Sequence, residues 1–259
     1  MIWAFKNLAA GAVRWPLWTR LAVADIQQTY RRSFIGMAWI TFSFAMFIGV
    51  KILIFGSISA ADNDLFAAWL SIGFLIWAYV AGNVTDGCNV FINARPWILG
   101  TKMPLSVFVY QSLTRHLINL AYSSLVIIVL LWVLKWQLTS VAWWAIPGML
   151  VLVLNAWWVQ IFLGVLSSRH RDLIHLVQSG MRVLFFITPI LYMPDQLGGN
   201  AFLLTYNPFT HFLAIVRDPI VLGTIPSASW MVALGFSVFG WILAILTLQF
   251  WGRRVPFWV

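Results

Sequence analysis

The sequence predicts an all-α integral membrane protein with six transmembrane helices, and three observations lead to this fold class. Of the 259 residues, 62% are hydrophobic and only 9% are charged, whereas a soluble domain carries about a quarter charged residues. The mean hydropathy of +0.89 is that of a chain whose surface faces lipid. Six apolar stretches also have about the 20 residues that a helix needs to cross the hydrocarbon core. They are residues 34–58, 66–92, 108–134, 141–166, 173–193 and 228–251.

The Lys and Arg residues predict the orientation of these helices. Residues 1–33 contain five of them, and the loops after the second and fourth stretches and the C-terminus contain two each. The opposite side has only Lys135 and Arg217, and it also carries Asp62, Asp64 and Asp195. Because basic residues accumulate in cytoplasmic loops, both termini of this multi-pass chain are expected in the cytoplasm.

Two segments are predicted to lie at the membrane without crossing it. On an ideal helix through residues 2–25, the polar side chains fall within one arc, which predicts an amphipathic helix on the cytoplasmic leaflet that bends near Pro16. These side chains are Lys6, Asn7, Arg14, Arg20 and Asp25. Residues 193–227 combine prolines and glycines with short apolar pieces, which predicts re-entrant helices at the outer face. We therefore divide the chain into an interfacial and entrance segment, residues 1–33, and a transmembrane domain, residues 34–259.

Several kinds of chemistry are excluded by what the sequence lacks. It contains no Glu, no H-E-x-x-H motif and no Cys/His ligand cluster, so neither a pair of catalytic acids nor a metal site is expected. No Lys is followed by Ser or Thr, as a phosphate-binding P-loop requires, so the chain is not expected to hydrolyse ATP. The net charge of +9 does not predict a nucleic-acid partner, because the basic residues form no continuous stripe. The single cysteine, Cys88, is expected to be a small buried residue.

Polar side chains within the apolar stretches are costly in lipid and therefore mark candidate functional positions. In residues 173–193, four of them recur at three- and four-residue spacing and share one helix face. They are His175, Gln178, Ser179 and Arg182. This face either lines a polar pathway or belongs to a shallow end of the helix, from which Arg182 reaches the headgroups.

A second polar stripe lies in residues 66–92 and consists of Asn83, Asp86, Asn89 and Asn93. Asp86 is expected to meet Arg115 or His116 of the third stretch, which would neutralise the charges. This pair would act either as a structural clamp between two helices or as part of a transport pathway. Lys51, near the outer end of the first stretch, is expected to extend to the headgroups.

Three segments carry a family resemblance. Residues 25–39 contain an acidic residue, then Tyr-Arg-Arg-Ser, a Gly and a Trp. Residues 186–192 read Phe-Ile-Thr-Pro-Ile-Leu-Tyr, and residues 207–223 begin with Asn-Pro and contain Arg-Asp-Pro. In this order and spacing they resemble the permease (transmembrane) subunits of bacterial polysaccharide-export ABC transporters, most closely those for O-antigen. The chain departs from that family after the second stretch, because Arg95-Pro96-Trp97 and the following residues lack the acid of the family's Phe-Pro-Arg-Glu pattern.

The resemblance implies an exporter in the bacterial inner (cytoplasmic) membrane that moves an undecaprenyl-pyrophosphate-linked polysaccharide outward. Two copies of the chain would form a homodimer and bind two copies of a cytoplasmic ATPase subunit, which would hold ATP and Mg. No cofactor is expected in this chain itself. Arg31 and Arg32 would either attract the pyrophosphate, since guanidinium pairs well with phosphate oxygens, or serve only to set the orientation of the first helix.

The expected site residues fall into four groups. The cytoplasmic entrance would consist of Tyr30, Arg31 and Arg32. The contact with the ATPase subunit would involve Arg95, Trp97 and Lys102. An outer-face gate would contain Asn207, Pro208, His211 and Arg217. The translocation pathway, where ring faces pack on sugars without fixing one hydrogen-bond pattern, would be lined by Trp39, Phe44, His175, Gln178, Arg182, Phe185, Phe186 and Tyr192.

Other functions remain open at the level of the sequence. The same architecture would suit export of capsule polysaccharide, teichoic acid or a small hydrophobic compound. An integral membrane glycosyl- or acyltransferase is a different class, and the absence of a polar catalytic constellation argues against it. A secondary carrier would be expected to show buried acids and an internal repeat, and the sequence shows neither.

Overall fold

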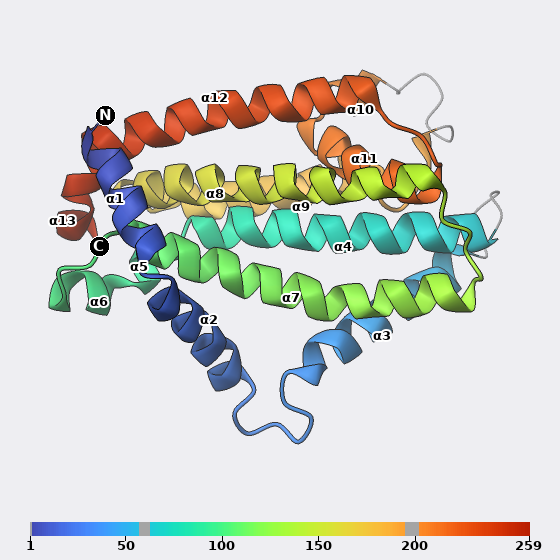
Figure 1. The fold of residues 1–259 in the computed structure, drawn as a ribbon, viewed down its shortest axis with the longest axis horizontal. Helices are drawn as coiled ribbons and strands as arrows, with labels where there is room; N and C mark the ends of the chain where they lie inside the picture. Colours follow the sequence, from blue (N-terminus) through green and yellow to red (C-terminus); the bar gives the residue numbers. More distant parts are fainter. Residues whose placement is uncertain (1, 57–62, 195–201) are drawn as a thin grey trace.

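The computed structural model describes residues 2–56, 63–194 and 202–259, and within these ranges it contains helices and no β-strand. The long helices are α3 (Ala38–Gly56), α4 (Asn63–Gly87), α7 (Ser106–Val133), α8 (Ala145–Arg169), α9 (Asp172–Ile187) and α12 (Ser227–Trp251). The shorter elements are α1 (Ile2–Val13), α2 (Trp15–Thr29), α5 (Val90–Asn93), α6 (Arg95–Gly100), η1 (Ser140–Trp144), α10 (Phe202–Tyr206), α11 (Pro208–Val221), η3 (Gly252–Arg254) and α13 (Val255–Trp258). Most of the long helices run side by side along the long axis of the molecule (Figure 1).

Five segments are helical, long and apolar enough to cross a membrane, which confirms a multi-pass membrane protein. They are Ala38–Phe55, Asn63–Gly87, Ser106–Val133, Ser140–Arg169 and Ser227–Trp258. The predicted fifth span, residues 173–193, corresponds to α9, which has only 16 residues and a length of about 24 Å. The helix ends early because Thr188 precedes Pro189, and a residue before proline avoids the helical conformation; Thr188 is extended, with φ −83° and ψ 135°. The six-span prediction is thus confirmed only for five helices.

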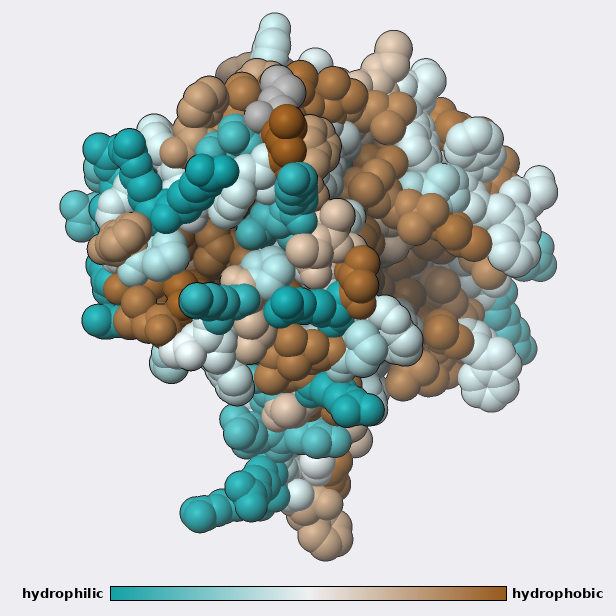
Figure 2. Space-filling model, turned by 60° about the vertical axis from the view of Figure 1, so that its left-hand side comes forward, coloured by the Kyte–Doolittle hydropathy of each residue, from teal (hydrophilic) through white to brown (hydrophobic). Residues whose placement is uncertain are grey.

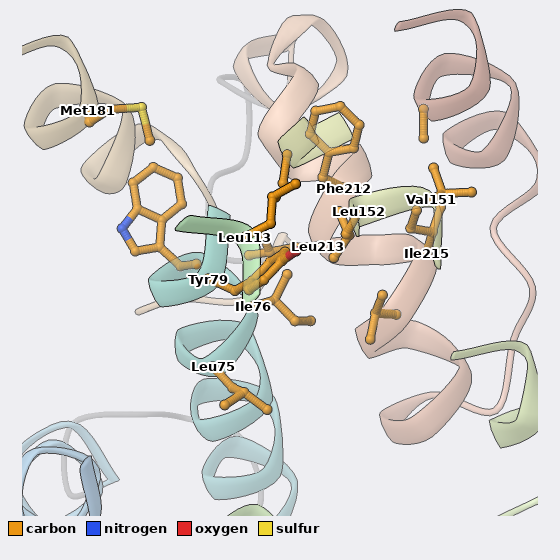
Figure 3. Close-up of a cluster of buried hydrophobic side chains, with 14 of the residues drawn as sticks. Leu75, Ile76, Tyr79, Leu113, Val151, Leu152, Met181, Phe212, Leu213 and Ile215 are labelled. Carbon is orange, nitrogen blue, oxygen red and sulfur yellow. The ribbon is translucent and has the colours of Figure 1, made fainter. Parts of the chain in front are cut away.

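The centre of the bundle is α4. In its most apolar window 72% of the residues are buried, against 6% for α3 and 11% for α7. Figure 3 shows how side chains of α4, such as Ile76 and Tyr79, meet Leu113 of α7 and Leu213 of α11. Neither periodicity nor moment distinguishes this helix in the sequence, because a helix that is buried all round is apolar all round.

Glycines allow the closest helix crossings. A Cβ atom on Gly240 of α12 would overlap the indole ring of Trp158 on α8. A Cβ atom on Gly148 of α8 would lie 2.5 Å from the carbonyl oxygen of Ile215 on α11. Small residues at such crossings let backbones approach within lipid, where no hydrophobic effect drives the helices together.

The predicted amphipathic helix over residues 2–25 is two helices that meet at Arg14, next to Pro16, so the bend is confirmed. It packs on the bundle more closely than a helix on the membrane surface would. The backbone amide of Ala4 donates to Gln249 Oε1 of α12, and that of Ser106 donates to Asn7 Oδ1. Asn7 therefore binds the first residue of α7, although the sequence places it on the solvent-facing arc.

Both termini lie at the same end of the bundle (Figure 1), because α1 contacts the C-terminal part of α12. We call it the basic end, since it carries Arg95, Lys102, Arg169, Arg171, Arg253 and Arg254. Figure 2 brings this end forward and shows hydrophilic side chains gathered on it, beside an apolar flank of the bundle. The guanidinium groups here also pack on rings: Arg169 Cζ lies 5.6 Å from the ring centroid of Trp251.

Candidate functional site

An ionic cluster joins α4 to α7. Arg115 Nη2 donates to Asp86 Oδ2 across 2.9 Å, and His116 Nε2 lies 3.2 Å from the same oxygen. The prediction that Asp86 meets Arg115 or His116 is confirmed for both partners. The Arg115 and Asp86 side chains are 31% and 47% exposed, whereas that of His116 is 9% exposed. The cluster therefore has a buried edge and an accessible edge.

On the accessible edge lies a cavity of about 510 Å³ between α2, the segment from α4 to α6, and α7. We call it the polar cavity, because eight of its twelve lining residues are polar or charged. Asp25 of α2 and Asp86 contribute carboxylates, and Arg115 contributes a guanidinium group. Gln111 Nε2 donates to Asp25 Oδ2 across 2.7 Å, which ties α2 to α7. Its volume is within the range typical of ligand-binding sites.

A second, smaller cavity of about 310 Å³ lies between α3, α4 and α7. We call it the middle cavity, because Leu75 and Leu120 in its lining come from the middle of α4 and α7. Tyr30, from the loop that joins α2 to α3, closes one side, and His116 lines another. Since Asp86 lines the polar cavity and His116 the middle cavity, the ionic cluster stands between the two.

A groove of about 540 Å³ separates α9 from α4. Four predicted pathway residues line it, namely Gln178, Arg182, Phe185 and Phe186. Phe185 also packs on Phe74 and Trp77 of α4, with ring centroids 5.4 and 5.7 Å apart. His175, from the same predicted face, is exposed on α9 and is not part of this lining.

The end of α9 and the start of α11 are joined by side chains. Asn207 caps α11, because its Oδ1 accepts from the backbone amide of Phe209 across 3.0 Å. Its Nδ2 donates to Thr188 Oγ1 across 2.9 Å. Pro208 occupies the first turn of α11, where a missing amide hydrogen has no consequence. One asparagine thus starts a helix and fixes the turn after α9.

Arg217 of α11 is the largest fully buried side chain, with 1% of its surface exposed. Its Nη1 donates to the carbonyl oxygen of Pro189 across 2.6 Å, and its Nε donates to Asp218 Oδ1 across 3.4 Å. Burial lowers the pKa of the Arg217 guanidinium to about 10, so the group keeps its charge at neutral pH. Trp69 of α4 covers its face. We call Trp69, Pro189, Tyr192, Asn207 and Arg217 the outer cluster.

The remaining predicted gate and pathway residues lie apart from these cavities. His211 of α11 is half-buried, with Nδ1 2.9 Å from Ser229 Oγ. Tyr192 donates its hydroxyl to the carbonyl oxygen of Ile187. On α3, Trp39 is 38% exposed and Phe44 packs partly against the core.

Three cationic side chains differ in their surroundings. Arg31 and Arg32 are exposed in the loop between α2 and α3. The Lys51 ammonium, expected to extend to the headgroups, lies over the rings of Phe47 and Phe74, 4.4 and 4.7 Å from their centroids. It is therefore held by cation–π contacts.

The residues expected to contact an ATPase subunit sit together at the basic end. Arg95 and Trp97 lie on α6 and Lys102 follows it, and all three are exposed. Trp97 also lines the polar cavity, so this surface and that cavity adjoin.

Sequence reasoning missed the part of the polar cavity that α7 contributes. Gln111 and Ser112 precede Arg115 by four and three residues, so they share its helix face. This spacing was a usable signal. Asp25 was recognised as polar but was assigned to solvent.

No protein-family model matches the chain. Curated relatives do: two proteins named O-antigen export system permease protein RfbA, both from Klebsiella pneumoniae, are 26% and 25% identical over 204 residues, 78% of this chain and 78% of each relative. The O-antigen export system permease protein RfbA of Myxococcus xanthus is 22% identical over 219 residues, 83% of this chain and 84% of that protein. The resemblance to polysaccharide-export permeases is thereby confirmed along most of the chain.

Proposed function

We propose that the chain is the transmembrane subunit of an ATP-driven exporter that moves a lipid-linked surface polysaccharide of the O-antigen type across the bacterial inner membrane. The observation that carries this proposal is the similarity to O-antigen export permeases, which covers 78–83% of the chain. The same observation favours O-antigen over capsule polysaccharide, teichoic acid or a small hydrophobic compound as the cargo.

In this proposal the chain makes six passes, with α9 as the fifth, and both termini face the cytoplasm. The shared end of the termini supports an even number of passes, because each crossing moves the chain to the opposite end. α9 begins three residues after α8 ends at the basic end, and the turn after it contacts Trp69, near the start of α4. The concentration of basic residues supports a cytoplasmic basic end. The helices α10 and α11 would then be re-entrant at the outer face.

Export would be powered by a separate subunit. Two copies of the chain would form a homodimer, and each would hold one ATPase subunit, which binds ATP and Mg, on the surface around Arg95, Trp97 and Lys102. The exposure of these three residues at one end of the bundle supports this arrangement. The exposed Arg31 and Arg32 and the ring of Tyr30 would form the entrance for the pyrophosphate-linked glycan, and the α9 groove would line its pathway.

Deletion of the gene tests the proposal. Glycan repeats should accumulate on their lipid inside the cell, with none at the surface, and a plasmid copy should restore export. Normal surface glycan in the deletion strain would contradict the proposal. As a second measurement, the purified chain should hydrolyse ATP only when its ATPase subunit is added, and turnover by the chain alone would contradict the division of labour.

A further inference from the structure

One hydroxyl group in the polar cavity has no partner. Ser112 of α7 is 6% exposed and lines the cavity, yet its Oγ makes no hydrogen bond within the described part of the chain. A buried polar group without a partner costs about 1–3 kcal/mol. A ligand that offers hydroxyl groups would satisfy it.

Two carboxylates nearby are held in fixed positions with acceptor capacity to spare. Asp25 Oδ2 accepts from Gln111, and Asp86 Oδ2 accepts from Arg115. Among the residues that the structure describes, no hydrogen bond reaches Oδ1 of either side chain. Each carboxylate can therefore accept from a further donor without reorganisation.

The charges of the cavity decide which ligand fits. Its lining holds two carboxylates and one guanidinium group, and that guanidinium group is already bound to Asp86. A phosphate or pyrophosphate would meet net negative charge here, because like charges repel at this distance. A neutral molecule with many hydroxyl groups would instead donate to the carboxylates. The indole ring of Trp97 adds a flat apolar surface of the kind on which the C–H face of a sugar packs.

We propose that the polar cavity binds a neutral sugar residue of the transported glycan before export. The inference rests on the proposed function and deepens it, since it separates two tasks. The cavity holds the sugar, while the lipid pyrophosphate is left to Arg31 and Arg32, which follow Thr29 of the cavity lining by two and three residues. A site built to hydrogen-bond hydroxyl groups discriminates strongly against ligands that lack them.

Binding to the full-length chain in detergent tests the inference. The probe is the neutral oligosaccharide released by mild acid from the host cell's own surface glycan, observed by saturation-transfer NMR. Ser112→Ala should weaken binding about fivefold, as expected for the net loss of one hydrogen bond. It should leave the melting temperature unchanged or higher, because it removes an unpaired hydroxyl. Ser167→Ala, the same change at a buried serine of α8 outside the cavity, should bind like the wild type.

Asn93→Ala provides a second variant that does not depend on buried packing, since Asn93 is exposed and lines the cavity. It should also weaken the probe. The inference is overturned if the probe does not bind the wild type, or if both cavity variants bind it as tightly as the wild type does. It is also overturned if the variants impair assembly with the ATPase subunit while sugar binding persists, since the cavity would then receive a protein segment. Binding of inorganic pyrophosphate that is lost in Ser112→Ala would overturn it too.

The two proposals can fail separately. Normal surface glycan in the deletion strain, together with a sugar signal that Ser112→Ala weakens, would remove the export function and leave the sugar site. Glycan trapped inside the deletion strain, together with sugar binding that the cavity variants do not change, would remove the sugar site and leave the export function.

Discussion

The guanidinium group of Arg217 lies flat on the indole ring of Trp69, with Cζ 3.2 Å from the ring centroid. The same guanidinium donates to the carbonyl oxygen of Pro189, and Trp69 Nε1 donates to that of Tyr192 across 3.2 Å. The turn after α9 is therefore held between α4 and α11. Two of the three segments that carry the family resemblance, residues 186–192 and 207–223, thus meet in one cluster.

Replacement of Arg217 should destabilise the protein strongly. Arg217→Gln removes the charge, the stacking on Trp69 and the bond to Pro189, and it leaves a buried carbonyl oxygen without a donor. Such a change in a buried network costs about 2–4 kcal/mol. Thermal unfolding of the purified chain should show a clearly lower melting temperature. Arg217→Lys should not rescue it, because an ammonium group cannot stack on the ring and donate in the same plane.

The matched control is Arg171→Gln at the basic end, where the side chain is exposed. It should melt within a degree or two of the wild type. If Arg217→Gln behaves like this control, the outer cluster does not hold α9 and α11 together.

The ion pair between Asp86 and Arg115 should show a modest coupling energy. Both side chains are partly exposed, so solvent screens the interaction and its expected value is about 1 kcal/mol. A double-mutant cycle of Asp86→Asn and Arg115→Gln, read from thermal or denaturant unfolding, measures it. The cycle of Asp172→Asn with Arg115→Gln provides the baseline, since Asp172 is exposed on another helix. Additive effects in the first cycle would assign the cluster to transport rather than to clamping.

Much of the fold follows from the sequence, because a helix that crosses lipid must be apolar over about 20 residues. The Asp86 contacts were predictable for a related reason: charges within spans are so few that their partners are nearly determined. Arg217 was predictable as a gate residue but not as a stacked, buried one. Its partner Trp69 is 148 positions earlier in the chain and is one of 17 tryptophans.

Faces and ends of helices were harder to predict. Amphipathic analysis of residues 2–25 shows which side chains share a face but not what that face meets. Asn7 and Asp25 therefore looked solvent-exposed, although they bind Ser106 and Gln111 of α7. Likewise hydropathy carried the predicted span past Ile187, where the backbone turns out of the helix before Pro189.

The docking of α1 should depend on Gly11. A Cβ atom there would overlap the side chain of Ser106, whose Oγ donates to the carbonyl oxygen of Asn7. Gly11→Ala should therefore loosen α1 by about 1–3 kcal/mol, as overpacking does. Limited trypsin digestion should cut faster after Lys6 and Arg14, because cleavage requires local opening of the helix. Gly49→Ala is the control, since an added methyl group meets nothing within 4 Å there. Equal digestion rates would mean that α1 is not anchored by this contact.

Arg31 and Arg32 allow a direct choice between binding the substrate and setting the topology. Arg31→Gln with Arg32→Gln removes two positive charges from the N-terminal segment, and Arg14→Gln with Arg20→Gln removes the same number from the same segment, again at exposed positions. If the guanidinium groups contact pyrophosphate, the first double variant should lower surface glycan per folded protein at least tenfold, as expected for losing one or more charge-assisted hydrogen bonds. The second should leave export near the wild-type level.

Orientation must be measured in the same cells. Phe257→Cys supplies a label site that is 86% exposed, and the native Cys88 is buried, so labelling from each side of the membrane reports where the C-terminus lies. If both double variants lose export in proportion to misoriented protein, the charges act only through the positive-inside rule. A loss confined to Arg31 and Arg32, with the label still on the cytoplasmic side, requires a contact that position-independent charge cannot supply.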